Sequence, residues 1–111
     1  MSDITKEAAK EWITKTCGEG RLNLVDIIYD NKPENIEITM VFNKWAGLKV
    51  DFIGKDVIFE ELLETIYSIS EKMCTICGKS GRRVVIGGVE TTLCDQHYNS
   101  IEGKEKYRAE K

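Results

Sequence analysis

Three cysteines and one histidine in the last third of the chain constrain its fold more than any other feature. Cys74 and Cys77 are separated by two residues, and after sixteen intervening residues the same spacing joins Cys94 to His97. Two such pairs supply the four ligands of a tetrahedral zinc site. Hard cations prefer oxygen ligands, which these four positions lack. The sequence therefore predicts a zinc ion bound by Cys74, Cys77, Cys94 and His97.

The alternative explanations of this motif are a chance arrangement and a disulfide framework. His97 is the single histidine of the chain, and three of its four cysteines belong to the motif, which disfavours chance. Three cysteines cannot pair completely, and no signal peptide precedes them. All four ligands come from protein, whereas a catalytic zinc keeps one position open, so we expect a structural ion. Without metal, the C-terminal third is expected to be loose or unfolded.

Length and composition indicate one compact domain in a soluble, cytoplasmic protein. The 111 residues are 41% hydrophobic and 32% charged, enough for one core and too few for two. We expect a body over residues 1–73 and a zinc-binding segment over residues 74–111. No apolar run is long enough to cross a bilayer, and the remaining cysteine, Cys17, fits a reducing compartment as an ordinary thiol.

Hydrophobic periodicity predicts an α+β body. A helix is expected between Ser2 and Cys17, ended by Gly18 and Gly20. The apolar run over Arg21–Asp30 is rich in β-branched residues and is predicted to be a strand. Alternating residues at 36–43 and 48–52 predict two further strands, which complete a small antiparallel β-meander. A helix capped by Asp56 and continuing to Met73 is expected to cover this sheet.

The zinc-binding segment is predicted to be treble-clef-like. Residues 74–78 resemble a zinc knuckle, in which glycine permits the turn. Residues 84–86 and 89–93, joined by two glycines, predict a β-hairpin with a primed turn. Cys94 and His97 then fall on the first turn of a terminal helix. A zinc ribbon, the alternative, would place a second knuckle there.

Three sequence patterns together carry a resemblance to a family of small uncharacterised bacterial and phage proteins. The patterns are the bend Lys44-Trp45-Ala46-Gly47-Leu48-Lys49, the knuckle Cys74-Thr75-Ile76-Cys77-Gly78, and Leu93-Cys94-Asp95-Gln96-His97. They resemble the family's K-[FW]-G-G-L-[KR] bend, C-x-x-C-G and L-C-D-x-H, although Ala46 replaces one glycine of the bend. The resemblance covers about residues 40–98. It implies a zinc-binding α+β protein from mobile or competitive genetic settings, and it implies no established activity.

Catalysis is not expected, because the chain offers few groups for it. Its single histidine is assigned to the metal, which leaves Cys17 without a histidine base. A zinc hydrolase would need an open ligand position or a nearby glutamate, and Glu90 is the one close candidate in sequence. The carboxylates of the second helix are better explained as solvated charges.

A protein-binding function is favoured, with an immunity protein that inhibits a toxin as its specific form. Residues 1–73 carry nine Lys or Arg against fourteen Asp or Glu, which suits a basic partner. The candidate contact residues are Asp26, Asp30, Glu34, Glu37 and, as an aromatic anchor, Trp45. For any single residue the plainer interpretation is favoured, a solvated edge for the acids and a core position beneath the second helix for Trp45.

The alternative function is a nucleic-acid-associated zinc module. Its phosphate contacts would come from Lys79, Arg82, Arg83, Lys104, Lys106, Arg108 and Lys111, with Tyr98 or Tyr107 for stacking. A sequence pI near 5.2 argues against a dense basic face. A hairpin rim and a frayed terminus explain the same residues more simply, and the sequence leaves the partner and the oligomeric state open.

Overall fold

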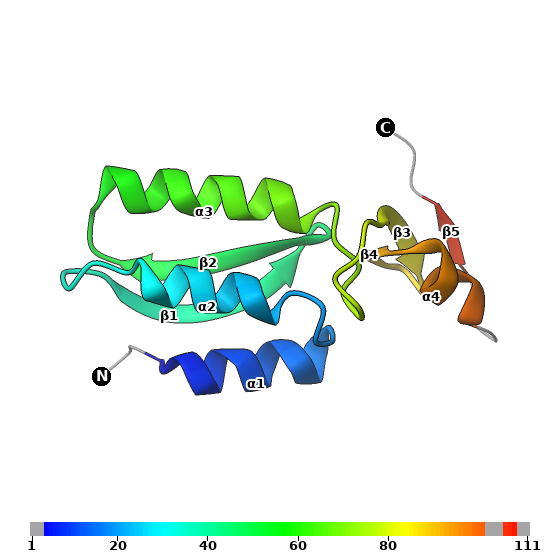
Figure 1. Ribbon diagram of the computed structural model, residues 1–111, viewed down its shortest axis with the longest axis horizontal. Coiled ribbons are helices and arrows are strands. Elements are labelled where there is room, and N and C mark those ends of the chain that lie inside the picture. The colour runs from blue at the N-terminus through cyan, green and yellow to red at the C-terminus, as the bar shows by residue number, and fades with distance from the viewer. Residues whose placement is uncertain (1–3, 102–105, 109–111) are drawn as a thin grey trace.

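The computed structural model describes residues 4–101 and the backbone of residues 106–108. Within these residues the chain has four helices and two small antiparallel sheets. In Figure 1 the body lies at one end of the molecule, and the segment that begins at Cys74, here called the cysteine-rich segment, lies at the other. The α+β class predicted from the sequence is confirmed.

The first helix, α1, spans Lys6–Thr16. Thr5 caps it, because its hydroxyl accepts a hydrogen bond from the amide three residues further on, at 3.0 Å. Ala9 and Ile13, four residues apart, are buried on one side of the helix. The helix expected between Ser2 and Cys17 is confirmed, although residues 1–3 lie outside the described part of the chain.

The second element is helix α2, Leu22–Asp30, so the strand predicted over Arg21–Asp30 is wrong. Leu24, Val25 and Ile28 are its buried residues, and positions i, i+1 and i+4 share one side of a helix but not of a strand. A continuous apolar run does not distinguish a buried strand from a buried helix. Here the segment packs against α1, which stabilises the helical form.

The body's sheet is therefore a hairpin rather than a three-stranded meander. Strand β1, Glu37–Lys44, pairs antiparallel with β2, Gly47–Ile53, in an otherwise regular register with one bulge. The two-residue turn between them has Trp45 at φ 54° and Ala46 at φ 70°. Both are left-handed conformations that glycine adopts at lower cost, so the bend forms despite the alanine.

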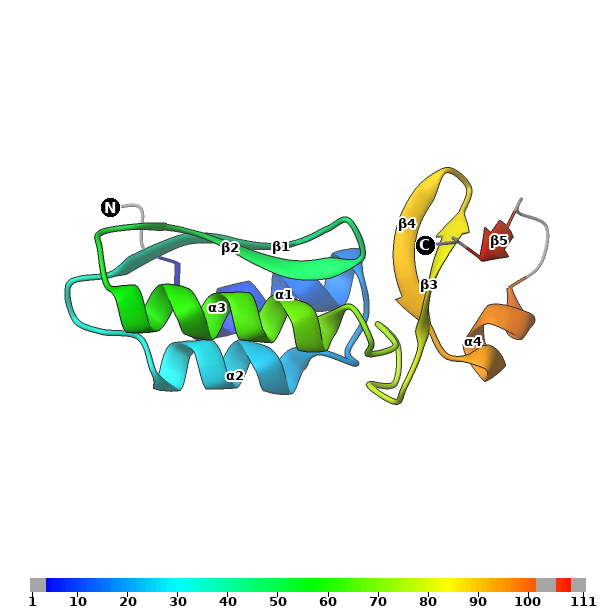
Figure 2. The ribbon, with the colours of Figure 1, turned by 90° about the horizontal axis from the view of Figure 1, so that it is seen from above.

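Helix α3, Val57–Ser70, completes the body. Asp56 caps it as predicted, since its carboxylate accepts the Phe59 amide proton at 2.8 Å. The three helices lie on one face of the hairpin, with α3 against β2, α1 against β1, and α2 in contact with both helices (Figures 1 and 2). The buried core between them consists of Ala9, Ile13, Leu24, Val25, Ile28, Ile36, Ile38, Val41, Leu48, Phe59 and Ile66.

The predicted knuckle, hairpin and helix follow in the predicted order. Strands β3, Arg82–Ile86, and β4, Val89–Leu93, form the hairpin, and helix α4 spans Asp95–Ser100. Gly87 and Gly88 have φ values of 58° and 85°, as a primed two-residue turn requires.

The sequence did not predict a third strand in this segment. Strand β5, Lys106–Arg108, pairs antiparallel with β3 on the side away from β4. The buried cluster of this part of the molecule is small and consists of Cys74, Val84 and Leu93. Because this cluster is small among the described residues, interactions other than apolar burial must contribute a large share of the segment's stability.

The buried side chain of Arg21 links elements of the body next to the first cysteine. Only 1% of Arg21 is exposed. Its Nη1 donates to Asn43 Oδ1 at 2.6 Å, and its Nη2 donates to the carbonyl oxygens of Ala46 and Ser70, both at 2.7 Å. A weaker contact of 3.4 Å reaches the carbonyl of Met73, immediately before the first cysteine of the knuckle. One guanidinium thus connects the start of α2, the β1–β2 turn and the end of α3.

Candidate metal centre

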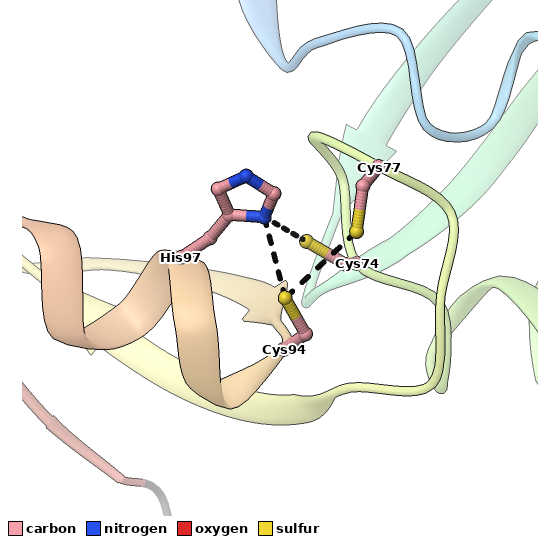
Figure 3. Close-up of side chains that lie close together, drawn as sticks. All are labelled: Cys74, Cys77, Cys94 and His97. Carbon is pink, nitrogen blue, oxygen red and sulfur yellow. Dashed lines mark hydrogen bonds between the residues drawn. The ribbon is translucent and has the colours of Figure 1, made fainter.

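Four side chains from two parts of the chain converge on one point (Figure 3). Cys74 and Cys77 belong to the knuckle after α3, while Cys94 is the N-cap residue of α4 and His97 lies in that helix. Their ligand atoms all lie within 4.8 Å of one another. These residues could hold a metal ion, as the sequence predicted.

Three of the distances between these ligand atoms fit a tetrahedral ion. Metal–sulfur bonds of about 2.3 Å and metal–nitrogen bonds of about 2.0 Å place two sulfurs about 3.8 Å apart, and a sulfur and a nitrogen about 3.5 Å apart. The Cys77 and Cys94 sulfurs are 3.8 Å apart. His97 Nδ1 lies 3.5 Å from the Cys74 sulfur and 3.2 Å from the Cys94 sulfur. The imidazole therefore faces the centre through Nδ1.

The surroundings of Cys74 favour its thiolate form. Burial by itself raises the pKa of the Cys74 thiol. Hydrogen bonds from the backbone amides of Cys94, Cys77 and Ile76 oppose that effect. Together with a hydrogen bond to His97, they lower the pKa of Cys74 to about 6. A thiolate is the form that binds a metal, so the knuckle backbone prepares one ligand in advance.

The pKa of Cys77 shifts in the opposite direction. The backbone amide of Lys79 lowers it, but desolvation and the neighbouring sulfurs of Cys74 and Cys94 raise it overall. Thiolates this close together repel one another unless a cation lies between them. The electrostatics of the cluster thus match its geometry, since a bound divalent cation would relieve the repulsion.

No carboxylate joins the cluster among the described residues. The group that could hold a metal contains three cysteines and one histidine, without aspartate or glutamate. Glu90, the residue the sequence suggested as a possible catalytic neighbour, instead lies 3.5 Å from Arg83 Nε, and Arg83 also pairs with Glu71 at 3.1 Å. Glu90 thus contributes to an ion-pair network on the hairpin rather than to the metal centre.

The loop between α1 and α2 packs directly against the backbone of the knuckle. The amide of Gly20 donates to the carbonyl oxygen of Thr75 at 2.8 Å. A Cβ atom at Gly20 would overlap the carbonyl oxygen of Cys74 and lie 2.5 Å from the amide nitrogen of Gly78. The sequence around Gly20 predicts only the end of a helix, because nothing local reveals which backbone approaches this glycine.

The Gly20→Ala variant is expected to lose about 1–3 kcal/mol of unfolding free energy and to bind metal more weakly, because the loop and the knuckle must separate. Urea unfolding and metal competition with a chelator would measure both effects. Gly87→Asn is the control, since its Cβ meets nothing within 4 Å and asparagine suits a primed turn. Equal stability and equal metal affinity of the two variants would contradict the described packing.

Cys17, the fourth cysteine, is not part of the cluster. It is half-buried at the C-terminal end of α1, where its sulfur lies 3.5 Å from the hydroxyl of Thr16. None of the four cysteines forms a disulfide.

The acidic residues proposed to contact a partner lie on α2, the following loop and the start of β1. Asp26 is 3.0 Å from Lys10 Nζ, and Asp30 is 3.9 Å from Lys6 Nζ, so lysines of α1 partly neutralise both. Glu34 is exposed in the loop, and Glu37 is half-buried at the first residue of β1.

Trp45 lies at the opposite end of the hairpin from Glu37. Trp45 is 62% exposed, so the core position considered for it is wrong. Lys44 Nζ lies over its ring, 4.7 Å from the ring centre. Strand β1 separates it from Glu37 by eight residues, or about 25 Å. The structure therefore does not bring Trp45 and Glu37 into one contact surface.

The residues proposed to contact nucleic acid differ from one another in exposure and in their interactions. Lys79 and Arg82 are exposed, whereas Arg83 is held by its two glutamates. Tyr98 packs against the small core of the cysteine-rich segment. Of the tail, Lys104 and Lys111 lie outside the described residues, and Lys106, Tyr107 and Arg108 are placed by their backbone in β5 alone.

Comparisons of the chain with protein-family models, with curated proteins and with solved structures found no significant match. In the described part of the chain, no helix has the length and apolar character needed to cross a membrane.

Proposed function

We propose that this chain is a zinc-stabilised, non-catalytic protein-binding factor. The convergence of three sulfurs and one imidazole nitrogen within 4.8 Å carries the proposal, because this donor set suits zinc and fills a tetrahedral shell. Cys74, Cys77, Cys94 and His97 would hold the ion. Its role would be to fix the knuckle, the β3–β4 hairpin and α4 against one another.

Four potential protein ligands, and a Glu90 that is paired with Arg83, support a structural rather than a catalytic ion. A catalytic zinc has three protein ligands and an open position, usually beside a general base. Here protein supplies four ligands, and Glu90 is engaged by Arg83. Four cysteines without a disulfide agree with a reducing cytoplasm as the proposed place of action.

Exposed apolar side chains and the acidic body support protein binding. Trp45 is 62% exposed, and Val57 and Ile58, at the start of α3, are 71% and 79% exposed. Large exposed side chains of this kind are common at protein interfaces. We propose a toxin domain with a basic surface as the partner and inhibition of that toxin as the outcome, consistent with the resemblance to proteins of competitive genetic settings.

A nucleic-acid-associated module is the second candidate, favoured by the exposure of Lys79 and Arg82 on the cysteine-rich segment. Arg83 is left unchanged in the variant that tests this candidate, because it forms ion pairs with Glu71 and Glu90. The double variant Lys79→Glu/Arg82→Glu is expected to retain partner binding and unfolding free energy. A salt-dependent nucleic-acid affinity that this variant loses would favour the second candidate, and electrophoretic mobility shifts at two salt concentrations would measure it.

Affinity capture tests the proposed function directly. The zinc-loaded chain is used as bait in its native lysate, with and without nuclease treatment, and the retained proteins are identified by mass spectrometry. A stoichiometric protein that survives nuclease treatment is expected. Recovery of nucleic acid alone, or of proteins that nuclease releases, would contradict the proposal.

A further inference from the structure

A groove runs between strand β2 and helix α3, outside the metal centre and outside the surfaces considered above. Its volume is about 380 Å³. The strand side is formed by Leu48, Lys49, Val50 and Phe52, and the helix side by Glu60, Leu63, Glu64, Tyr67 and Ser68. The helix residues follow the i, i+3, i+4, i+7 spacing, so a single stripe of α3 forms one wall along its length.

Strand β2 has a free edge on this side. In the described part of the chain it pairs with β1 alone. The amide of Leu48 points away from β1, because it donates to Ser70 Oγ at 2.8 Å. Since antiparallel strands alternate the direction of their backbone groups, Val50 and Phe52 also direct their amides and carbonyls away from β1. No backbone partner for these groups is found among the described residues.

One end of the groove is closed and the other is open and acidic. Tyr67 closes the end near Leu48, where its hydroxyl lies 3.2 Å from the carbonyl oxygen of Lys44 and Lys49 Nζ lies 4.9 Å from its ring centre. Toward the start of α3, Glu60 and Glu64 are exposed and form none of the ion pairs found among the described residues.

We propose that this groove binds an extended, basic peptide segment of the partner protein, which adds as a strand to the free edge of β2. Main-chain hydrogen bonds to Val50 and Phe52 would supply binding that does not depend on sequence. Glu60 and Glu64 would select lysine or arginine side chains, and Leu63 would contact an apolar one. From Leu48 to Phe52 the edge measures about 13 Å, which accommodates about five residues of extended chain. This inference rests on the proposed protein-binding function and adds the chemistry of the bound segment.

Selection from a random ten-residue peptide library, with the full zinc-loaded chain as target, tests the inference. The selected peptides are expected to be rich in lysine or arginine and in β-branched residues. Glu60→Lys/Glu64→Lys should weaken binding of a selected peptide at least about tenfold, because two favourable charge pairs become repulsive. The control Glu11→Lys/Glu61→Lys makes the same change in net charge at exposed positions outside the groove, and it should change the dissociation constant less than about twofold.

A change in the peptide alone tests strand addition without altering the protein. N-methylation of alternate amides should abolish binding in one register and spare it in the other, because successive amides of a strand face opposite sides. Failure to select any peptide, selection of acidic peptides, or equal tolerance of both methylation registers would overturn the inference. A self-association of the unmodified chain that Glu60→Lys/Glu64→Lys abolishes in sedimentation would assign the edge to a second copy and overturn it as well.

Using both double variants as bait in the native lysate separates the two proposals. A partner retained equally by the unmodified chain and by Glu60→Lys/Glu64→Lys would refute the groove and leave protein binding intact. A lysate from which the unmodified chain retains no protein would refute the protein-binding function itself. Loss of the partner from Glu60→Lys/Glu64→Lys, with retention by Glu11→Lys/Glu61→Lys, is the expected result.

Discussion

Replacing Cys94 with serine is expected to lower bound zinc from one ion per chain to a small fraction and to unfold the cysteine-rich segment. The Cys94 sulfur lies 3.8 Å from that of Cys77 and 3.2 Å from His97 Nδ1, so its loss opens the ligand shell. A serine hydroxyl is a much poorer ligand for zinc than a thiolate. Structural zinc contributes on the order of 10–16 kcal/mol to folding in zinc-finger peptides, more than this segment's small buried cluster can replace.

Metal analysis by plasma mass spectrometry and hydrogen exchange across the chain would measure these effects. Exchange should accelerate over residues 74–101 and much less over α1 and α2, whose contacts belong to the body's own core. Cys17→Ser is the matched control, because it removes a thiol outside the cluster and should retain one zinc ion. Full zinc content and unchanged protection in Cys94→Ser would refute the four-ligand assignment.

Replacing Arg21 with methionine is expected to reduce the unfolding free energy of the whole chain by about 3–5 kcal/mol. The guanidinium is 1% exposed and donates to Asn43 and to the carbonyl oxygens of Ala46 and Ser70. Methionine fills similar space but removes three hydrogen bonds from a charged donor, leaving the Ala46 carbonyl with Thr92 Oγ1 and the Ser70 carbonyl with the Met73 amide as donors. Burial lowers the pKa of Arg21, although the charges of Cys17 and Cys74 act to raise it.

Urea unfolding of Arg21→Met beside Arg82→Met would measure this effect. Arg82 is exposed, so the same chemical change there should alter stability by less than about 0.5 kcal/mol. Arg21→Lys should also be destabilised, since one ammonium cannot reproduce the forked donors of a guanidinium. Equal stability of Arg21→Met and Arg82→Met would show that the buried network contributes little.

The residues that could hold a metal were predictable from the sequence because their spacing has few other physical explanations. Cys74, Cys77, Cys94 and His97 form two pairs whose spacing matches a knuckle and a helix turn, and local geometry of this kind is encoded locally. The same holds for the cap at Asp56. These predictions required no knowledge of how distant parts of the chain pack.

One error and one omission concern contacts between distant parts of the chain, and a second error concerns a local turn. The run over Arg21–Asp30 is apolar and β-branched, and only its packing against α1 and α3 makes it helical. Trp45 was assigned to the core as its plainer interpretation, but the left-handed turn directs it to solvent. Arg21 itself carries no local signal of burial, because its acceptors come from residues 43–73.

X-ray absorption at the zinc edge, on the full chain purified without added metal, tests the central proposal most directly. One zinc ion per chain is expected, with three sulfur neighbours at about 2.3 Å and one nitrogen at about 2.0 Å, and with no oxygen neighbour. A shell with fewer sulfurs and a water oxygen would indicate an open and potentially catalytic site. Absence of bound zinc, together with a cysteine-rich segment that remains folded, would contradict the proposal that a metal ion holds this part of the molecule together.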